Sequence, residues 1–353
     1  MNHMQKIREG MPAYNIDAML LTGPVNRRWA TGFASSAGAL VIAEKESVYI
    51  TDCRYIESAR AQIQGARVVE IGTGEDYSAL IDEVLVRNGV KALGFEEDVM
   101  TQGTYAKYQE KLSAKLVPAE TLVETLRWSK SEAELALMQK AQDITDKTFA
   151  QVLKLITPDM TERELTAEIV YHLLKNGSER PAFDPIIVGG TRSSLPHGVP
   201  GNHKLEGFVT IDFGAVCEGY HSDMTRTIAI GTVTDEMKRV YETVQAAQLA
   251  GIAAARVGAI GKDVDKAARD VITAAGYGDC FGHGLGHSLG LQIHETLRAS
   301  PKEERAFPLG LAITIEPGIY LPGKFGVRIE DTVYLTENGV ENLTKTPKEL
   351  IIL

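Results

Sequence analysis

The stretch Val209–Gly231 constrains the fold of this chain more than any other segment. Apolar and polar residues alternate along 209–213, which predicts a β-strand with Asp212 on the face opposite the apolar side chains. A turn-prone segment, Cys217–Gly219, follows, and a second alternating run begins with Asp223. With the turn centred directly after Cys217, Asp212 and Asp223 are predicted to lie directly opposite each other in a hairpin. Because like charges in that position repel, the pair favours a bound cation or a shared proton. The alternative is a hairpin whose two acids face solvent.

The composition is that of a soluble globular protein. Hydrophobic residues make up 44% of the 353 residues and charged residues 24%, and this length is comfortable for two domains. The formal net charge of −10 argues against a nucleic acid or an anionic membrane as partner, since both bind basic surfaces. No apolar run approaches the ~20 residues of a membrane-spanning helix.

The cysteines and the first residues bear on where the protein works. Cys53, Cys217 and Cys280 are widely spaced and form no Cys-x-x-Cys pair. This pattern fits free thiols in a reducing compartment and excludes a disulfide framework and a thiolate zinc site. Met1–Gly10 is too polar for a secretory signal peptide. We therefore expect a cytoplasmic protein.

Residues 1–125 are expected to form a smaller α/β domain. Short runs of strand-forming residues alternate there with helically spaced segments, which is typical of an α/β layer. Neither Gly-x-Gly-x-x-Gly nor the P-loop motif is present, so no phosphate-binding loop is predicted. The domain boundary is placed near Leu126, where the pattern changes. The expected strands are Ala18–Thr22, Ala39–Ala43, Ser47–Thr51, Arg67–Ile71 and Lys91–Phe95, and the expected helices are Arg54–Gln64 and Ser78–Asn88.

Residues 126–353 show a repeated order of helix, break, helix and acidic hairpin. The acid pairs are Asp212 with Asp223 in the first half and Glu316 with Glu330 in the second. An internal duplication with pseudo-twofold symmetry would bring the two hairpins together in one sheet. The expected fold class is therefore α+β. The expected helices are 131–156, 161–176, 234–256 and 262–276, and the strands of the second hairpin are Ala312–Glu316 and Val327–Leu335.

Four converging carboxylates predict a metal centre, because two divalent ions would offset their charge of −4. His287 lies in Gly282–His287, where the glycines permit the backbone to approach closely. An oxygen-rich set with one imidazole suits Mn²⁺, Co²⁺ or Zn²⁺. Two such ions can lower the pKa of a shared water and polarise a carbonyl group. The pattern thus predicts a dinuclear centre, with Mn²⁺ favoured.

These motifs resemble the pita-bread metallopeptidases, and among them the branch of the Xaa-Pro dipeptidases (prolidases) and aminopeptidase P. The resemblance implies a C-terminal pita-bread domain with pseudo-twofold α/β halves and, far more weakly, a creatinase-like N-terminal domain. It also implies a homodimer that acts on small proline-containing peptides. The segments that carry the resemblance are Leu195–Gly198, Asp212–Thr227, Gly282–His287, Gly290–Glu295, Thr314–Tyr320 and Val327–Asp331.

The resemblance implies a set of five metal ligands. Asp212 is expected to bind one ion, and His287 with Glu316 the other. Asp223 and Glu330 are expected to bridge both ions. Glu316 is in addition the expected general base for the bridging water.

Other residues acquire substrate roles by the same resemblance. His197 and His294 are expected to stabilise the scissile carbonyl and the tetrahedral intermediate. His283 is expected in the pocket for proline, and Arg328 is expected to support Glu330 from behind.

The chain departs from the family pattern after the His-Glu pair at 294–295. Many members have a proline soon after that pair, whereas this chain has Thr296-Leu297-Arg298. Arg298 resembles in position an arginine with which dipeptidase members bind the free carboxylate of proline, and a guanidinium matches a carboxylate with two parallel hydrogen bonds. The resemblance therefore narrowly favours an Xaa-Pro dipeptidase over an Xaa-Pro aminopeptidase that accepts longer peptides. The alternative is that Arg298 is only a solvated surface residue, in which case the dipeptidase would not be favoured over the aminopeptidase.

Two further functions exist on the same fold. Creatinase-type amidinohydrolases work without metal, and non-catalytic peptide-binding modules have lost ligands. This chain retains all five ligand residues and has an acidic net charge, so both alternatives are disfavoured.

Overall fold

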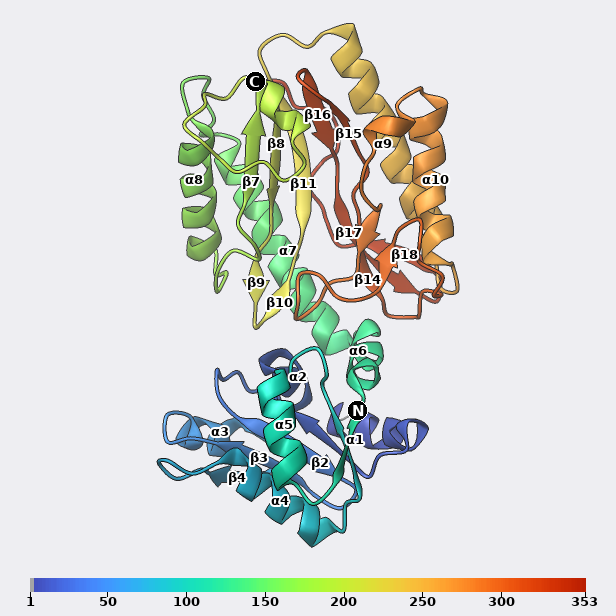
Figure 1. The fold of residues 1–353 in the computed structure, drawn as a ribbon. Helices are drawn as coiled ribbons and strands as arrows, with labels where there is room; N and C mark the ends of the chain where they lie inside the picture. The colour runs from blue at the N-terminus through green and yellow to red at the C-terminus, as the bar shows by residue number, and fades with distance from the viewer. Residues whose placement is uncertain (1–2) are drawn as a thin grey trace. The chain divides into compact units, whose positions relative to one another are not determined.

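In the computed structural model, which describes residues 3–353, the chain forms two compact units, Met1–Arg127 and Trp128–Leu353 (Figure 1). The predicted boundary between residues 125 and 126 falls inside the helix α6 (Glu120–Trp128). Residues 1 and 2, with which the first predicted domain and the polar segment Met1–Gly10 begin, lie outside the described residues. Both units combine helices and strands, as expected from the sequence.

The first unit is built on one six-stranded sheet with the strand order β4-β3-β2-β1-β5-β6. The pairs β1–β2 and β2–β3 are antiparallel, and the other neighbours are parallel. The strands are β1 (Ala18–Leu21), β2 (Ala39–Ala43), β3 (Ser47–Thr51), β4 (Arg67–Glu70), β5 (Ala92–Phe95) and β6 (Lys115–Pro118). The helices are α1 (His3–Gly10), α2 (Pro24–Thr31), α3 (Ile56–Gln62), α4 (Tyr77–Asn88), α5 (Gln102–Lys111) and α6.

The sequence predicted five of these strands to within one residue at each end, but it missed β6 and several helices. The helix α5 explains one such omission, because Tyr108 is its only fully buried residue. Without an apolar stripe a helix leaves no periodic signal in the sequence. The strands β1, β2 and β3 are buried along their whole length. Their sequences are therefore mostly apolar, and this made the strands predictable.

A buried polar cluster lies where β5 ends. Glu96 is fully buried and accepts hydrogen bonds from the backbone N–H groups of Thr22 and Gly23 and from Asn26 Nδ2. Glu120 has only a long contact, 3.4 Å from its Oε1 to Asn26 Nδ2, and its Oε2 is buried without a hydrogen-bond partner among the described residues. Burial, reinforced by the charge of Glu96, raises the pKa of Glu120 to about 8.

This cluster predicts that Glu120 makes stability depend on pH. An unfolded glutamate loses its proton near pH 4.5, whereas folded Glu120 keeps it up to about pH 8. Because the folded state holds this proton more tightly than the unfolded state, protonated Glu120 stabilises the fold. This stabilisation is complete below about pH 4.5 and is lost as the pH rises from about 4.5 to about 8. Glu120→Gln cannot ionise, so it is expected to exceed the wild type in unfolding free energy by on the order of a few kcal/mol at about pH 9 and to differ little at about pH 5.

Urea unfolding of the whole chain at both pH values measures this difference. Glu110→Gln, at an exposed position of α5, is the control and is expected to change stability little at either pH. A gain for Glu120→Gln that is the same at both pH values would contradict the assignment.

The second unit consists of two halves. Figure 1 shows α7 and α8 beside β7, β8 and β11, and α9 and α10 beside the strands of the second half. The helices are α7 (Glu132–Val152), α8 (Glu162–Lys175), α9 (Asp235–Ala254) and α10 (Gly261–Ala274). The strands of the first half are β7 (Ile186–Gly189), β8 (Gly207–Phe213), β9 (Val216–Cys217), β10 (Tyr220–His221) and β11 (Met224–Ile230). Those of the second are β12 (Gly286–His287), β13 (Arg298–Ala299), β14 (Ala312–Ile315), β15 (Gly318–Leu321), β16 (Phe325–Arg328), β17 (Asp331–Thr336) and β18 (Gly339–Asn342).

Three helices of this unit begin at capping residues that coincide with the first residues of the predicted ranges. Ser131 and Thr161 each form a capping box, with Glu134 and Glu164, and Thr234 caps α9. Each half has its own hydrophobic core, formed between its helices and its strands. The predicted order of helix, break, helix and hairpin is therefore present twice.

The predicted register of the first hairpin is wrong by two residues. Asp212 pairs with Thr225, and the turn is formed by Glu218 and Gly219. Both turn residues have positive φ, 46° and 83°, which is the type I′ geometry of two-residue hairpins. The turn thus lies one residue later than expected, and Asp223 stands across from Gly214 instead of Asp212. Because side chains alternate with a period of two, both acids still share one face.

The second hairpin places its acids directly across from each other. Glu316 and Glu330 lie between the registered pairs Ile315–Asp331 and Gly318–Arg328. The single strand predicted over Val327–Leu335 is instead the two strands β16 and β17, because the ladder is interrupted at this point. The backbone N–H of Glu330 donates to Thr225 O (3.1 Å), and that of Glu316 to Leu285 O (2.8 Å). Both acids therefore lie where the backbone changes partners.

The two hairpins belong to separate sheets, which corrects the expectation of one shared sheet. The ladder between them is replaced by hydroxyl groups of β11. Thr227 Oγ1 donates to Arg328 O (2.9 Å) and accepts from Arg328 N (3.1 Å). Thr332 Oγ1 donates to Asp223 O (3.0 Å). The hairpins are thus joined mainly by side chains, with the backbone hydrogen bond from Glu330 N to Thr225 O beside them, where the prediction expected a regular sheet.

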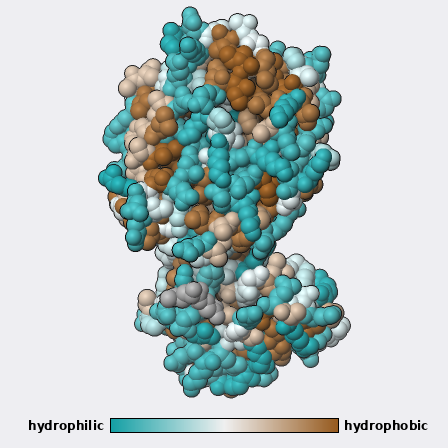
Figure 2. All heavy atoms as spheres, turned by 180° about the vertical axis from the view of Figure 1, so that it is seen from behind, coloured by the Kyte–Doolittle hydropathy of each residue, from teal (hydrophilic) through white to brown (hydrophobic). Residues whose placement is uncertain are grey.

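The surface combines hydrophilic and hydrophobic areas. Figure 2 shows one face on which hydrophilic side chains predominate, with hydrophobic side chains in patches over the larger unit. Exposed hydrophobic side chains include Tyr171 and Leu174 on α8. Among the described residues, no helix is long and apolar enough to cross a membrane.

Candidate metal centre and its pocket

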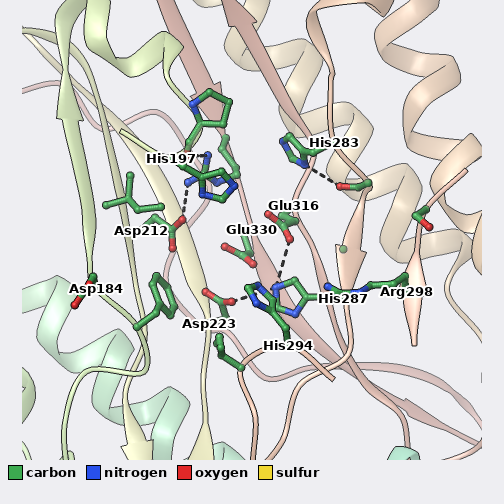
Figure 3. Close-up of a pocket in the computed structure, with 18 of the residues that line it drawn as sticks. Asp184, His197, Asp212, Asp223, His283, His287, His294, Arg298, Glu316 and Glu330 are labelled. Atoms are coloured by element: carbon green, nitrogen blue, oxygen red, sulfur yellow. Dashed lines mark hydrogen bonds and ion pairs between the residues drawn. The ribbon is translucent and has the colours of Figure 1, made fainter. Parts of the chain in front are cut away.

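A cavity of about 530 Å³ lies in the second unit and is lined by residues from both of its halves (Figure 3). This volume suits a small ligand. All ten site residues predicted from the sequence line it: Asp212, Asp223, His287, Glu316, Glu330, His197, His283, His294, Arg298 and Arg328.

Three of the predicted ligands form a compact group. One ligand atom each from Asp223, His287 and Glu330 lie within 4.8 Å of one another, and all three residues are buried. His287 Nε2 is 3.5 Å from Asp223 Oδ2 and 3.6 Å from Glu316 Oε1. His287 Nδ1 lies 3.3 Å from Ser288 O. A hydrogen bond there would leave Nε2 unprotonated toward the acids, as a metal ligand requires.

Asp212 lies in the same cavity but is held by Arg328. The distance between Arg328 Nη2 and Asp212 Oδ2 is 2.5 Å. Arg328 reaches Glu330 only through Thr225, whose hydroxyl donates to Glu330 Oε2 (2.6 Å) and lies 3.2 Å from Arg328 Nε. The predicted support of Glu330 by Arg328 is therefore indirect, and the direct partner of Arg328 is Asp212.

Two carboxylate oxygens of this group are unsatisfied. Asp212 Oδ1 and Asp223 Oδ1 are buried, and neither has a hydrogen-bond partner among residues 3–353. Buried carboxylate oxygens are normally paired, because leaving them bare is costly. A divalent cation would satisfy them, so the donor set present here fits the metal ions that the sequence predicted.

The electrostatics of the acids lead to the same conclusion. Burial, together with the charge of Asp212, raises the pKa of Asp223 well above its usual value. Burial, followed by the charges of Asp223 and Glu316, does the same for Glu330. The pKa of Glu316 rises to about 7, mainly through burial. Asp223, Glu316 and Glu330 therefore favour their protonated forms unless a positive charge offsets them, and bound cations would take the place of these protons.

Two histidines with lowered pKa values, His283 and His294, lie beside this centre. The His294 ring packs edge-on against that of His287, with 4.3 Å between ring centroids. His283 Nε2 lies 2.9 Å from Tyr320 Oη. Desolvation is the main cause that lowers the pKa of both His283 and His294 to about 4. Both rings are therefore neutral at pH 7.

Arg298 offers an unused guanidinium to the cavity. It is the cross-strand partner of His287 in the pair β12–β13. The side chain is half-buried, and across the described part of the chain no hydrogen bond or ion pair engages its guanidinium. Desolvation lowers its pKa from the ordinary arginine value. A half-buried guanidinium without a partner is suited to binding an anionic group.

Sequence reasoning missed three polar residues of the cavity, Tyr320, Asp184 and Ser300. Tyr320 lines it, and its hydroxyl oxygen accepts a hydrogen bond from Arg328 Nη1 (2.9 Å) and lies 2.9 Å from His283 Nε2. Tyr320 stands within the quoted segment Thr314–Tyr320, so the motif itself was the available signal. Asp184 also lines the cavity and precedes β7. No motif marked it.

The remaining histidines lie elsewhere. His221 is buried against Gly290 O (3.0 Å from Nδ1) and is not among the residues that line the cavity. His172 lies 3.1 Å from Gln151 Oε1, and His203 is exposed.

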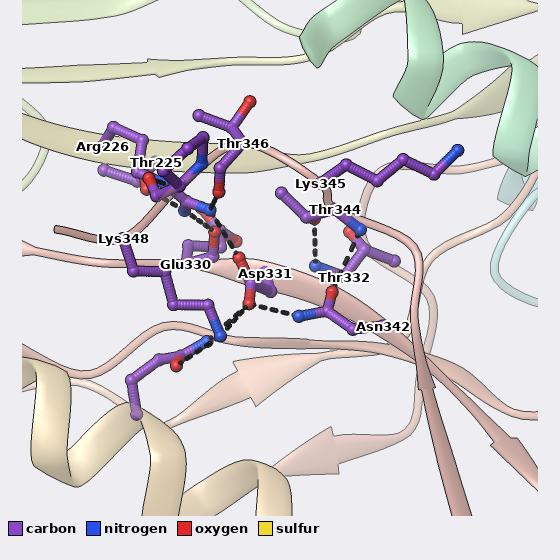
Figure 4. A network of polar contacts seen from close by, with 12 residues as sticks. Thr225, Arg226, Glu330, Asp331, Thr332, Asn342, Thr344, Lys345, Thr346 and Lys348 are labelled. Carbon is purple, nitrogen blue, oxygen red and sulfur yellow. Dashed lines mark hydrogen bonds and ion pairs between the residues drawn. The ribbon is translucent and has the colours of Figure 1, made fainter.

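Glu330 is held from behind by a buried network around Arg226 and Asp331 (Figure 4). Arg226 Nη1 donates to the carbonyl oxygens of Thr225 (2.9 Å) and Glu330 (2.7 Å), so it joins the two hairpins. Its Nη2 pairs with Asp331 at 2.8 Å, and Lys348 Nζ pairs with the same carboxylate at 2.6 Å. Although burial opposes ionisation, these cations hold the pKa of Asp331 below its usual value.

Arg226→Met is expected to destabilise the protein strongly, because it removes one of the two cations that pair with the buried charge of Asp331 and leaves its Oδ1 without the hydrogen bond from Arg226. Removing one partner of a buried pair costs about 3–5 kcal/mol. The matched control is Lys345→Met, which removes an exposed pair with Asp143 and is expected to cost at most about 1 kcal/mol. Denaturant unfolding measures both. Similar small losses in the two variants would refute the role given to Arg226.

A second buried ion pair fixes the loop that carries His294. Lys130 Nζ lies 2.8 Å from Glu295 Oε2, and both side chains are almost fully buried. Glu295 N donates to Ser288 O (2.8 Å), which closes the loop on itself. The residue after His294 is therefore anchored in the interior, while His294 reaches the cavity.

Comparison with known protein families assigns the chain to a family. Residues 136–337, more than half of the sequence, match the model of metallopeptidase family M24. The chain belongs to metallopeptidase family M24. Residues 3–128 match the creatinase/prolidase N-terminal domain. The resemblance inferred from the motifs is thereby confirmed.

Individual relatives in family M24 match over almost the whole chain. An Xaa-Pro dipeptidase of Pyrococcus horikoshii is 37% identical, covering 99% of this chain and 98% of the relative. The solved Xaa-Pro dipeptidase from Bacillus anthracis is 39% identical with a TM-score of 0.96 and covers 99% of both chains. The X-Pro aminopeptidase from Thermotoga maritima is 33% identical with a TM-score of 0.92, covering 98% of this chain and 100% of that one. Relatives of both names therefore share this fold.

Proposed function

We propose that this M24 protein is a dinuclear metallo-exopeptidase that hydrolyses the peptide bond before proline, and that it is an Xaa-Pro dipeptidase. The observation that carries the proposal is the set of four acids, three of them buried, and the buried His287 around one cavity, with two carboxylate oxygens that lack a hydrogen-bond partner among the described residues. The names of the Pyrococcus horikoshii and Bacillus anthracis relatives support the choice of substrate.

The centre is proposed to hold two divalent ions, with Mn²⁺ favoured and Co²⁺ or Zn²⁺ as alternatives. Asp212 would hold one ion, His287 and Glu316 the other, and Asp223 and Glu330 both. Bound there, the ions would supply a water of lowered pKa and polarise the scissile carbonyl. The unpaired oxygens of Asp212 and Asp223 and the 3.6 Å approach of Glu316 to His287 support this division.

Glu316 is proposed as the general base, because its carboxylate combines cavity exposure with proximity to His287. It would accept the proton of the attacking water and pass it to the leaving nitrogen of proline. Thr314 Oγ1 lies 3.2 Å from Glu316 Oε1 and limits the orientations of the carboxylate. Proline needs such dedicated chemistry, since its tertiary amide offers no N–H for alignment.

His197 and His294 are proposed to stabilise the carbonyl oxygen and the tetrahedral intermediate. Both line the cavity, and for neither ring is a hydrogen bond recorded within the described residues. An imidazole N–H of each ring could be donated to a developing oxyanion. His283, whose ring lies beside Tyr320 and packs edge-on against Phe281, is proposed to form a wall of the proline pocket.

Arg298 supports the dipeptidase over the aminopeptidase. A dipeptide ends in the carboxylate of proline, and the unpaired guanidinium of Arg298 would bind that group with two parallel hydrogen bonds. An aminopeptidase must instead leave room for further residues. The similarity to the X-Pro aminopeptidase from Thermotoga maritima keeps this function as the second candidate.

The other two functions gain no support. A creatinase-type amidinohydrolase needs no metal, whereas all five ligand residues are present here and line one cavity. The same observation disfavours a non-catalytic peptide-binding module. A homodimer and a cytoplasmic location remain predictions, and the acidic net charge still disfavours a nucleic-acid or membrane partner.

Removal of metal is expected to abolish release of proline from Ala-Pro, and Mn²⁺ or Co²⁺ is expected to restore it. Elemental analysis should find two ions per active chain. Asp223→Asn removes a bridging charge and is expected to lower metal content and turnover more than Asp212→Asn, since Asp212 is proposed to hold one ion only. Full activity in a sample verified as metal-free would rule out the proposal.

Arg298→Ala is expected to raise KM for Ala-Pro about ten- to a hundredfold, because a lost charged hydrogen bond costs about 1.5–3 kcal/mol. KM for Ala-Pro-Ala should change far less, since its carboxylate lies one residue further on. The matched control is Arg256→Ala, at an exposed position between α9 and α10. Equal losses on both peptides, or a wild-type preference for the tripeptide, would transfer the assignment to the aminopeptidase.

A further inference from the structure

Asp184 presents a carboxylate at the edge of the cavity. It precedes β7, in which Ile186 is the cross-strand partner of Asp212. Asp184 and Ile186 both line the cavity, so the alternation of the chain brings Asp184 to the side on which Asp212 lies. Asp184 is exposed, and no hydrogen bond or ion pair is recorded for its carboxylate over residues 3–353.

Asp184 and Arg298 are the two charged groups of the cavity that remain after the others have found partners. Four acids belong to the proposed metal centre, and Arg328 is paired with Asp212. Figure 3 shows Asp184 and Arg298 on opposite sides of this centre, Asp184 beyond Asp212 and Arg298 beyond His287. The cavity thus has a negative end and a positive end.

We propose that Asp184 binds the α-ammonium group of the substrate and thereby determines that the enzyme acts at a free amino terminus. This inference rests on the proposed function. At neutral pH a dipeptide carries one ammonium and one carboxylate, and the cavity presents the complementary charges in that order. With the proline carboxylate at Arg298, the amino terminus points toward the Asp212 side of the centre, where Asp184 lies.

The assignment explains how the substrate is restricted at its first residue. A peptide with a blocked or extended amino terminus would bring an uncharged amide toward Asp184. The carboxylate would then lose water without gaining an ionic partner, which is costly in a partly enclosed site. Asp184 is therefore a specificity-determining residue and takes no part in proton transfer.

The test compares Ala-Pro with L-lactyl-proline, in which a hydroxyl group replaces the ammonium. Asp184→Asn keeps the shape of the side chain and removes its charge. KM for Ala-Pro is expected to rise about ten- to a hundredfold with kcat nearly unchanged, because ground state and transition state lose the contact equally. The inhibition constant of L-lactyl-proline is expected to stay within about twofold of the wild type.

Asp279→Asn, an exposed acid that does not line the cavity, is the matched control and should leave both constants unchanged. An unchanged KM for Ala-Pro in Asp184→Asn, or an equal weakening of Ala-Pro and L-lactyl-proline, overturns the assignment while the proposed function stands. Wild-type protein that is loaded with metal and still fails to hydrolyse Ala-Pro overturns the proposed function, and the assignment with it.

Discussion

The junction of β11 with β16 and β17 is the contact on which the site depends. The regular backbone ladder is interrupted there. One backbone hydrogen bond, from Glu330 N to Thr225 O, remains, and the hydroxyl groups of Thr225 and Thr227 add side-chain hydrogen bonds between the two hairpins. Each hydroxyl is buried, so losing one leaves a polar group unsatisfied at a cost of about 1–3 kcal/mol. This junction holds acids from two separate hairpins at one point against their mutual repulsion. The flanking helices and cores make it rigid, and the chemistry proposed for the cavity requires that rigidity.

The types of residue and their order along the chain were enough to predict which side chains form the metal centre. They were not enough to predict the backbone geometry of the two hairpins that carry these side chains. Acids on alternating strands and the glycine-rich segment before His287 indicated which side chains converge. The register of the first hairpin was not predictable in the same way, because Glu218 adopts a positive φ that non-glycine residues seldom take. The break before Asp331 was hidden too, since the apolar residues of β16 and β17 continue the same alternation across it.

Outside the motifs of the metal centre, contacts between residues far apart in the sequence could not be predicted. Arg226 looked like an ordinary strand residue, yet it is buried and binds Asp331, more than a hundred positions away. Asp184 carries no motif and gains significance only through the register of β7 with β8. Periodicity reports which face of an element is buried. It does not report which element lies on the other side, and that is what gives these residues their roles.

The network around Arg226 has a consequence for the biosynthesis of the protein. Arg226 also donates to the carbonyl oxygens of Thr346 and Pro347, and Leu353 pairs with Ala229 on β11. These partners are translated more than a hundred codons after the strand they support. While the ribosome still holds residues 346–353, the charge of Asp331 lacks Lys348 and the backbone beside Glu330 lacks part of its scaffold. The buried charge of Asp331 and the backbone beside Glu330 therefore gain their full set of partners only once residues 346–353 have left the ribosome.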